Sequence, residues 1–296
     1  MTEDARPMSI WQILDMSVRL YRQRFLTVFG ASMIIGLAGY VVNRFFVFMV
    51  QDYLADIEPA AVGLLDLVPL LIITAGTLAL GFMVLFVEVG VLSAVARDAY
   101  FGKDSSLWQS MVSVSYGNLL GTALLATLLV GIGIVLLIVP ALILSIAFVL
   151  APVIVVAEGL KPSTNLKRSW QLVRMRLPGG FLQNTIVRIA IIWIFVGILN
   201  LLSMATVLSV TRAAPNSWKT HRTVSSPAVQ WEIPLPRLRP GPQVGIDIFS
   251  ELVQAFFRPF GVCAILMLYY DVRMRREGLD IDWILSDASP GEEDNL

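Results

Sequence analysis

Six segments of this chain are long and apolar enough to cross a lipid bilayer. A helix needs about 20 apolar residues to cross the hydrocarbon core of a bilayer, which is roughly 30 Å thick. A single helix over 117–158 would be about 63 Å long, so we expect a break near Val139–Pro140 that separates two spans. The predicted spans are 25–50, 67–96, 117–139, 141–158, 181–211 and 246–270.

The composition supports a membrane protein. Of the 296 residues, 56% are hydrophobic and 15% are charged, whereas a soluble domain has about 45–50% apolar and about 25% charged residues. These values exclude a disordered chain, a basic nucleic-acid binder and a disulfide scaffold. Because Cys263 and His221 are the single residues of their types, we expect no disulfide, no metal or other cofactor, and no catalytic residue.

The distribution of Lys and Arg predicts the orientation. If the N-terminus is inside, the inner segments hold fourteen basic residues and the outer segments hold five. The excess of basic residues on the cytoplasmic side of membrane proteins therefore predicts that both termini are cytoplasmic. We expect one multi-pass domain over 1–285, a Pro-rich external loop over 212–245, and a disordered acidic tail over 286–296.

Three amphipathic segments, 9–24, 105–115 and 163–176, precede pairs of predicted spans. Each contains a Trp-Gln pair, and Ser9 with Gln12 matches a capping box, which marks the start of a helix. We predict an all-α fold of three parallel repeats, each an interfacial helix followed by a two-span hairpin. A coincidence of three Trp-Gln pairs is the alternative.

The amphipathic segments also predict lipid as a partner. Indole rings favour the headgroup level of a bilayer, and basic side chains reach lipid phosphates. The alternatives are simple anchoring of the chain and specific lipid binding. The candidate headgroup contacts are Trp11, Arg19, Arg22, Trp108, Lys167, Arg168 and Trp170.

Ionisable residues inside the predicted spans are candidate functional residues, because a charge is costly there. Helix rise places Glu88 and Arg188 at similar depths from the inner side, and Arg44 and Glu251 both near the outer side. We therefore expect the ion pairs Glu88–Arg188 and Arg44–Glu251. Arg258 has no obvious partner at its depth. Such pairs either hold helices together or mark a path for protons or ions.

Several stretches resemble a bacterial six-span family, which is named for the glycerophosphoryl diester phosphodiesterase membrane domain. The resemblance lies in Ile13–Arg22, Val139–Leu144, Ala151–Gly159, Leu166–Val173, Leu268–Arg273 and Arg276–Asp280. It implies a six-span protein of the bacterial inner membrane. It also directs attention to a cytoplasmic-face cluster, in which cap and anchor chemistry is the plainer alternative to a functional role. The cluster comprises Glu158, Arg168, Ser169, Trp170, Asp271 and Arg273.

The family takes its name from members in which this membrane region is fused to a soluble phosphodiesterase barrel. Such a barrel needs about 250 residues, and no soluble segment here exceeds the 34 residues of 212–245. The resemblance therefore supplies no catalytic residue.

We expect a non-enzymatic scaffold or accessory module that contacts lipid and, in some assemblies, other membrane proteins. The alternatives are a transporter or channel subunit for a small solute or lipid, and an intramembrane enzyme. A lipid-sized lateral groove would favour a lipid role, and a continuous polar cavity through Glu88 and Arg188 would favour transport.

Overall fold

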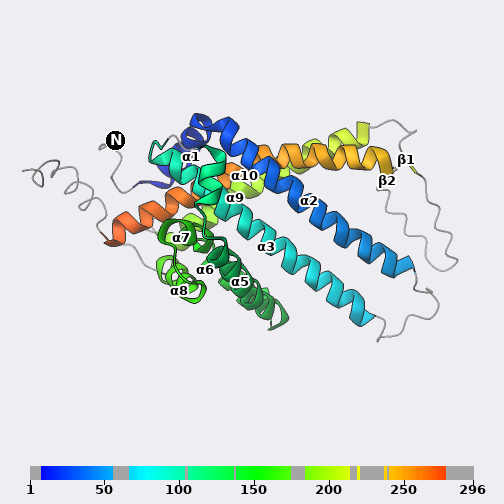
Figure 1. Ribbon diagram of the computed structural model, residues 1–296, viewed down its shortest axis with the longest axis horizontal. Coiled ribbons are helices and arrows are strands. Elements are labelled where there is room, and N and C mark those ends of the chain that lie inside the picture. The colour runs from blue at the N-terminus through cyan, green and yellow to red at the C-terminus, as the bar shows by residue number, and fades with distance from the viewer. Residues whose placement is uncertain are drawn as a thin grey trace, which may run out of the picture.

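The computed structural model describes residues 8–55, 67–103, 106–136, 138–174, 184–213, 219–220, 237–238 and 240–277. Helices account for almost all of these residues (Figure 1). The helices are α1 (Ile10–Gln23), α2 (Phe25–Ala55), α3 (Leu67–Tyr100), α4 (Leu107–Val112), α5 (Tyr116–Leu136), α6 (Ile138–Ala147), α7 (Ala151–Glu158), α8 (Pro162–Val173), α9 (Thr185–Ala213) and α10 (Pro240–Glu277).

The predicted class is confirmed, because the described residues form an all-α fold with six apolar segments long enough to span a membrane. α2 packs against α3, α5 against α6, and α9 against α10, so consecutive spans form the three expected hairpins. The segments are Phe25–Met49, Thr74–Tyr100, Tyr116–Ile134, Val139–Glu158, Thr185–Ala213 and Val244–Glu277.

The break expected near Pro140 lies just before that residue. α5 ends at Leu136 and α6 begins at Ile138, so Pro140 is in the first turn of α6, where its missing N–H has no helical partner to lose. Gly133 permits a tight hairpin, because a Cβ there would lie 3.0 Å from the backbone of Ala141.

The fourth span is interrupted within its length, beside Pro152. It consists of α6 and α7, separated by a turn over 148–150. Pro152 lies at the start of α7, and without an N–H it cannot donate to the carbonyl of Phe148 four residues earlier. The Ala151 N–H donates to that carbonyl instead, at 3.0 Å. The Ala147 carbonyl is thus left for a partner outside its own helix.

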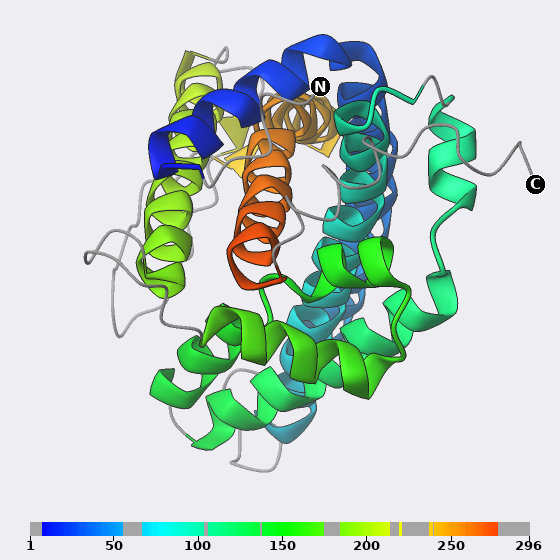
Figure 2. The ribbon, with the colours of Figure 1, turned by 90° about the vertical axis from the view of Figure 1, so that its left-hand side faces the viewer.

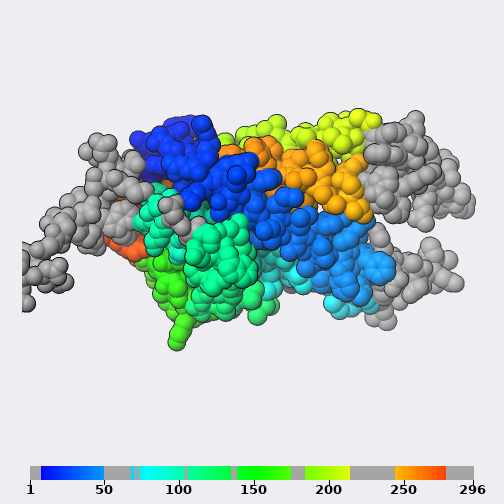
Figure 3. Space-filling view, turned by 45° about the horizontal axis from the view of Figure 1, so that its top comes forward, coloured from blue at the N-terminus to red at the C-terminus, as the bar shows by residue number. Residues whose placement is uncertain are grey.

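The three short amphipathic helices lie at one end of the bundle, around the last turns of α10 (Figure 2). We call this the capped end; it is formed by α1, α4, α8 and the last turns of α3 and α10. The long helices extend from it toward what we call the far end (Figure 1). In the space-filling view, α1 and α2 form one continuous band along the molecule, beside α10 (Figure 3).

Two of the three Trp-Gln pairs occupy equivalent positions. Ser9 and Ser106 cap α1 and α4, and each forms a full capping box with the Gln three residues later. Trp170 lies late in α8, which instead begins after Lys161 with a proline in its first turn. The third segment therefore shares the residue pair but not its place in the helix.

The predicted external loop is shorter than expected at both ends, because α9 continues to Ala213 and α10 begins at Pro240. Within it, the structure describes two short antiparallel strands, β1 (Lys219–Thr220) and β2 (Arg237–Leu238). The rest of the predicted 212–245 loop, apart from its helical ends, and the predicted 286–296 tail lie outside the described residues.

α10 is the central helix of the fold and packs against α1, α2, α3, α7 and α9. Its buried face toward the capped end contributes Val262, Leu266 and Met267 to the main apolar core. A second apolar cluster, with Leu119 and Ala151, joins α3, α5 and α7. The two cores hold the capped end together, while the helices leave a cavity further along the bundle.

Candidate functional site

A half-open cavity of about 760 Å³ lies between the hairpins, with walls from α2, α3, α6, α7, α9 and α10. Most of its lining is apolar, including Phe46, Leu85 and Trp193. Among the described lining residues, the charged side chains are Glu88, Glu251 and Arg258. The cavity is therefore an apolar chamber with one charged cluster in its wall.

Arg258 is the centre of that cluster. Its Nη1 donates to Glu88 Oε1 at 3.2 Å, and its Nη2 donates to Glu251 Oε2 at 3.0 Å and to Gln254 Oε1 at 2.7 Å. Glu88 also accepts a longer hydrogen bond from the Ser32 hydroxyl at 3.4 Å. One guanidinium therefore binds two carboxylates that come from different hairpins.

The spacing along α10 builds this arrangement. Glu251, Gln254 and Arg258 follow one another at three and four residues, so they share one face of the helix. Gly36 on α2 provides the space opposite, because a Cβ there would lie 2.9 Å from Arg258 Nη1 and 3.2 Å from Glu251 Oε2. The missing side chain at residue 36 lets α2 pack over the cluster.

A second ion pair continues the polar face of α10 toward the far end. Arg44 Nη1 lies 3.7 Å from Asp247 Oδ2, and the Tyr40 hydroxyl donates to the same carboxylate at 3.2 Å. Tyr40 also lines the cavity. Polar side chains therefore run along α10 from Asp247 to Arg258 on the side that faces α2.

Both ion pairs expected from the sequence are wrong in their partners. Glu88 pairs with Arg258 rather than Arg188, and Arg44 pairs with Asp247 rather than Glu251. Helix rise gives the depth of a residue in the bilayer, but it does not tell which way its side chain points. The spacing of Glu251 and Arg258 on one helix face was the signal that could have identified their contact.

Arg188 instead forms a buried ion pair with Asp271 at the capped end. Arg188 Nη1 pairs with Asp271, and the two side chains are 2% and 0% exposed. Asp271 also accepts a hydrogen bond from the Met8 backbone N–H at 2.6 Å, and it forms an ion pair with Arg275 at 3.0 Å. The carbonyl of Met8 accepts from Arg188 and Arg275. This network ties the residues before α1 to α9 and α10.

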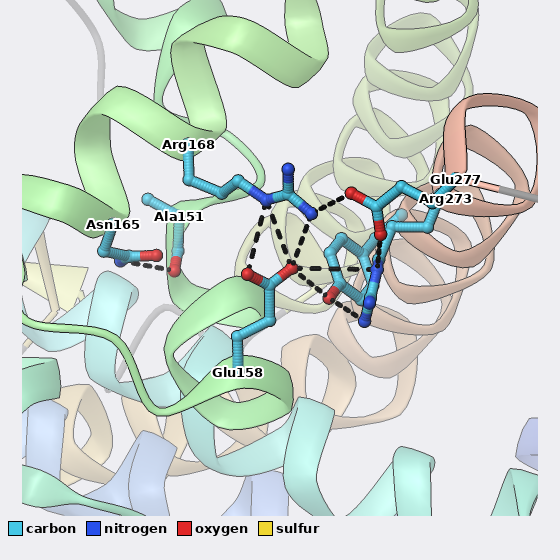
Figure 4. A network of polar contacts seen from close by, with 7 residues as sticks. Ala151, Glu158, Asn165, Arg168, Arg273 and Glu277 are labelled. Atoms are coloured by element: carbon cyan, nitrogen blue, oxygen red, sulfur yellow. Dashed lines mark hydrogen bonds and ion pairs between the residues drawn. The ribbon is translucent and has the colours of Figure 1, made fainter. Parts of the chain in front are cut away.

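The expected cytoplasmic-face cluster divides into separate contacts, of which the largest is a network around Arg168 (Figure 4). Arg168 lies 3.3 Å from Glu158 and also pairs with Glu277. Arg273 bonds Glu277 at 2.8 Å, and the Tyr269 hydroxyl donates to Glu158 at 2.8 Å. Asp271 is not part of this network, since it forms the buried ion pair with Arg188.

The pKa of Arg168 reflects two opposing effects. Burial lowers it, but hydrogen bonds and charge from Glu277 and Glu158 outweigh burial, so the pKa is raised above its ordinary value. The guanidinium therefore stays charged and holds α7, α8 and α10 together.

Ser169 and Asn165 satisfy the backbone at the break in the fourth span. The Ser169 hydroxyl donates to the Ala147 carbonyl at 2.7 Å, and the Asn165 amide donates to the Ala151 carbonyl at 2.9 Å. Both side chains come from α8 and are fully buried. α8 thus supplies the donor that the Ala147 carbonyl lacks, and a second donor to the Ala151 carbonyl at the start of α7, which explains how a buried span can be interrupted.

The candidate headgroup contacts lie at the capped end. Trp11 is 73% exposed and Trp108 is 72% exposed, while Trp170 is exposed to a lesser degree. Arg19 and Arg22 line a surface hollow on α1, and Lys167 is exposed on α8. These residues are accessible from outside the protein, and Arg19 forms an exposed ion pair with Asp15 at 3.5 Å. Arg168 differs, because it is engaged in the network just described.

Sequence reasoning missed Asp98 at the end of α3. Its carboxylate accepts from the Ser110 hydroxyl of α4 at 2.7 Å, and Arg97 lies 3.1 Å away. The position of an acid at the end of an apolar run, next to a basic residue, was the available signal. Asp98, Glu158 and Asp271 all occur at the capped-end terminus of the second span of a hairpin.

The described residues contain no group of three or more His, Cys, Asp or Glu side chains that could hold a metal ion.

Comparison with known proteins yields one family. The model of a domain of unknown function, DUF7847, matches residues 101–271. No curated protein and no solved structure matches the chain.

Proposed function

We propose a function for this chain, which belongs to the family of the domain of unknown function DUF7847: it is a non-enzymatic membrane module that contacts lipid through its capped end. The observation that carries the proposal is the two-sided character of α1. Its inner face packs into the core through residues such as Ile13 and Tyr21, while Trp11, Arg19 and Arg22 face outward.

The outward residues suit the boundary between headgroups and acyl chains. Tryptophan favours that level, and each basic residue near an anionic leaflet contributes about 1 kcal/mol. We assign the capped end to the cytoplasmic leaflet, since the excess of basic residues lies in the segments that form it. Both termini are then cytoplasmic, and the membrane is that of a bacterial cell.

We further propose that the chain consists of three repeats related by an axis along the membrane normal. The support is a cyclic set of contacts. Asp98 holds α4, Glu158 holds α8, and Asp271 holds the Met8 N–H that precedes α1. In this scheme the acid near the end of each of the first two hairpins binds the amphipathic helix of the next unit, and the acid of the third hairpin binds the residue that leads into α1. We also propose that this chain is related to the glycerophosphoryl diester phosphodiesterase membrane domain. The support is that both have six spans.

The proposal is tested by lipid retention. Purification of the full chain from membranes that contain phosphatidylglycerol, followed by quantification of bound lipid, gives the reference value. Arg19→Gln and Arg22→Gln should each lower the affinity for anionic lipid about fivefold, which corresponds to about 1 kcal/mol.

Arg212→Gln is the matched control, because it removes one exposed positive charge from the end of α9, away from the capped end. Equal lipid retention in all three variants and the unchanged chain would contradict the proposal.

A transporter or channel subunit for a small solute or lipid is the second candidate. The half-open cavity with Arg258 in its wall favours it. In the described residues of α10, the polar face does not continue from Arg258 to Asp271, because Val262, Leu266 and Met267 are buried between them. This apolar packing supports a binding module over a permanently open path.

A further inference from the structure

We propose that the intramembrane cavity binds an amphiphilic organic cation, with its charged head against Glu88 and Glu251 and its apolar body in the remaining volume. The inference goes beyond the proposed lipid contact, because it concerns a different site. The cavity shares none of the described lining residues with the outward face of α1.

The size of the cavity suits an organic molecule. Sites for small molecules are about 300–1,000 Å³ and mostly apolar, with a few placed polar groups. A volume of about 760 Å³ falls within that range, and the apolar wall includes aromatic side chains from α2, α3 and α9. A single water molecule or bare ion would leave most of this volume and its apolar wall without contacts.

The charges decide the sign of the head group. Two carboxylates, Glu88 and Glu251, share the single guanidinium of Arg258. The cluster therefore has a formal surplus of one negative charge, and the neighbouring pair Arg44–Asp247 is balanced. Because charge interactions are stronger in an apolar surrounding than in water, a cationic head is attracted to the cluster and an anionic head is repelled.

The cluster is also accessible from the cavity through Arg258 and Glu251, whereas the Glu88 side chain is 5% exposed. The Arg258 side chain is 22% exposed and that of Glu251 is 17% exposed, although both lie within an apolar helix bundle. By contrast, the carboxylate of Asp271 is enclosed completely by its partners. A head group can therefore reach Glu251 without breaking the packed core.

The direct test measures binding of tetraphenylphosphonium to the purified full chain by equilibrium dialysis, beside its size-matched anion tetraphenylborate. We expect the cation to bind and the anion to bind at least tenfold more weakly. Glu251→Gln keeps the size of the side chain and removes the surplus charge, and it should weaken cation binding about tenfold.

A steric pair of variants locates the site. Gly81 and Gly76 both lie on α3, and a Cβ at either position meets nothing within 4 Å, but Gly81 lines the cavity and Gly76 does not. Gly81→Phe should therefore abolish cation binding, whereas Gly76→Phe should leave it unchanged.

Three results would each overturn the proposal: equal binding of the two ions, unchanged cation binding in Glu251→Gln, or equal effects of Gly81→Phe and Gly76→Phe. If Gly81→Phe does not fold, the comparison of the two ions and Glu251→Gln still decide the outcome. Retention of phosphatidylglycerol, which tests the capped end, is measured separately, so failure of one proposal leaves the other standing.

Discussion

Two arginines in apolar helices of this protein have opposite surroundings. Arg188 lies at the capped end with Asp271, enclosed and satisfied by the backbone of Met8. Arg258 lies in the cavity wall, where two carboxylates compete for it. The comparison teaches that an ionisable residue in a span is informative only together with its burial and charge balance. The enclosed, satisfied pair holds the chain together, and the accessible, unbalanced cluster can recognise a ligand.

The largest expected effect comes from removing the carboxylate of the enclosed Arg188–Asp271 pair. Asp271→Ala should lower the free energy of unfolding by about 3 kcal/mol or more, because it leaves Arg188 buried without its carboxylate. Thermal unfolding of the detergent-purified chain measures the loss. The double variant Arg188→Met with Asp271→Leu should be more stable than Asp271→Ala alone. If the double variant is the less stable one, the buried charge is not the cause.

The next effect concerns the break in the fourth span. Ser169→Ala should cost about 1–2 kcal/mol, because the Ala147 carbonyl loses its donor while it remains buried. Ser17→Ala is the control. Ser17 is also buried, but its hydroxyl donates to the carbonyl of Ile13 inside a regular helix, and the helical N–H still serves that carbonyl. Equal losses in the two variants would show that α8 does not support the break.

The cavity cluster should tolerate substitution better than the enclosed pair does. Glu88→Gln should change the free energy of unfolding by about 1 kcal/mol, since Arg258 keeps Glu251 and Gln254 as acceptors and no buried charge is left without a partner. The same unfolding measurement, made beside Asp271→Ala, tests the comparison directly. A loss as large as that of Asp271→Ala would mean that the cluster is structural.

The smallest effect on stability is expected from the exposed indoles. Trp11→Ala and Trp108→Ala should each change the free energy of unfolding by about 0.5 kcal/mol or less, because neither side chain packs in the core. In bilayers that contain a quencher at the headgroup level, each should reduce the quenchable part of the tryptophan fluorescence. An unchanged quenchable part would show that these rings lie away from the headgroups.

Much of the fold could be predicted from the sequence. Length and apolarity identified six spans, and the Ser-Gln capping box predicted the start of α1. These features are local, because a helix is stabilised by its own hydrogen bonds and caps, and a span is defined by its own apolar length. The accessible tryptophans of α1 and α4 followed from the same amphipathic patterns.

The contacts between helices required the tertiary structure. Depth along a helix was computable, but the partners of Glu88 and Arg44 depended on which helices are neighbours and which faces meet. Pro152 marks a bend in the sequence, but the donor that satisfies the Ala147 carbonyl at the break comes from Ser169 on another helix. The sequence alone thus determined six spans and the capping box that begins α1, since those depend on local bonding and on apolar length. Only the tertiary structure decided which charges are enclosed and which line a cavity, because pairing and burial arise from packing between segments distant in the chain.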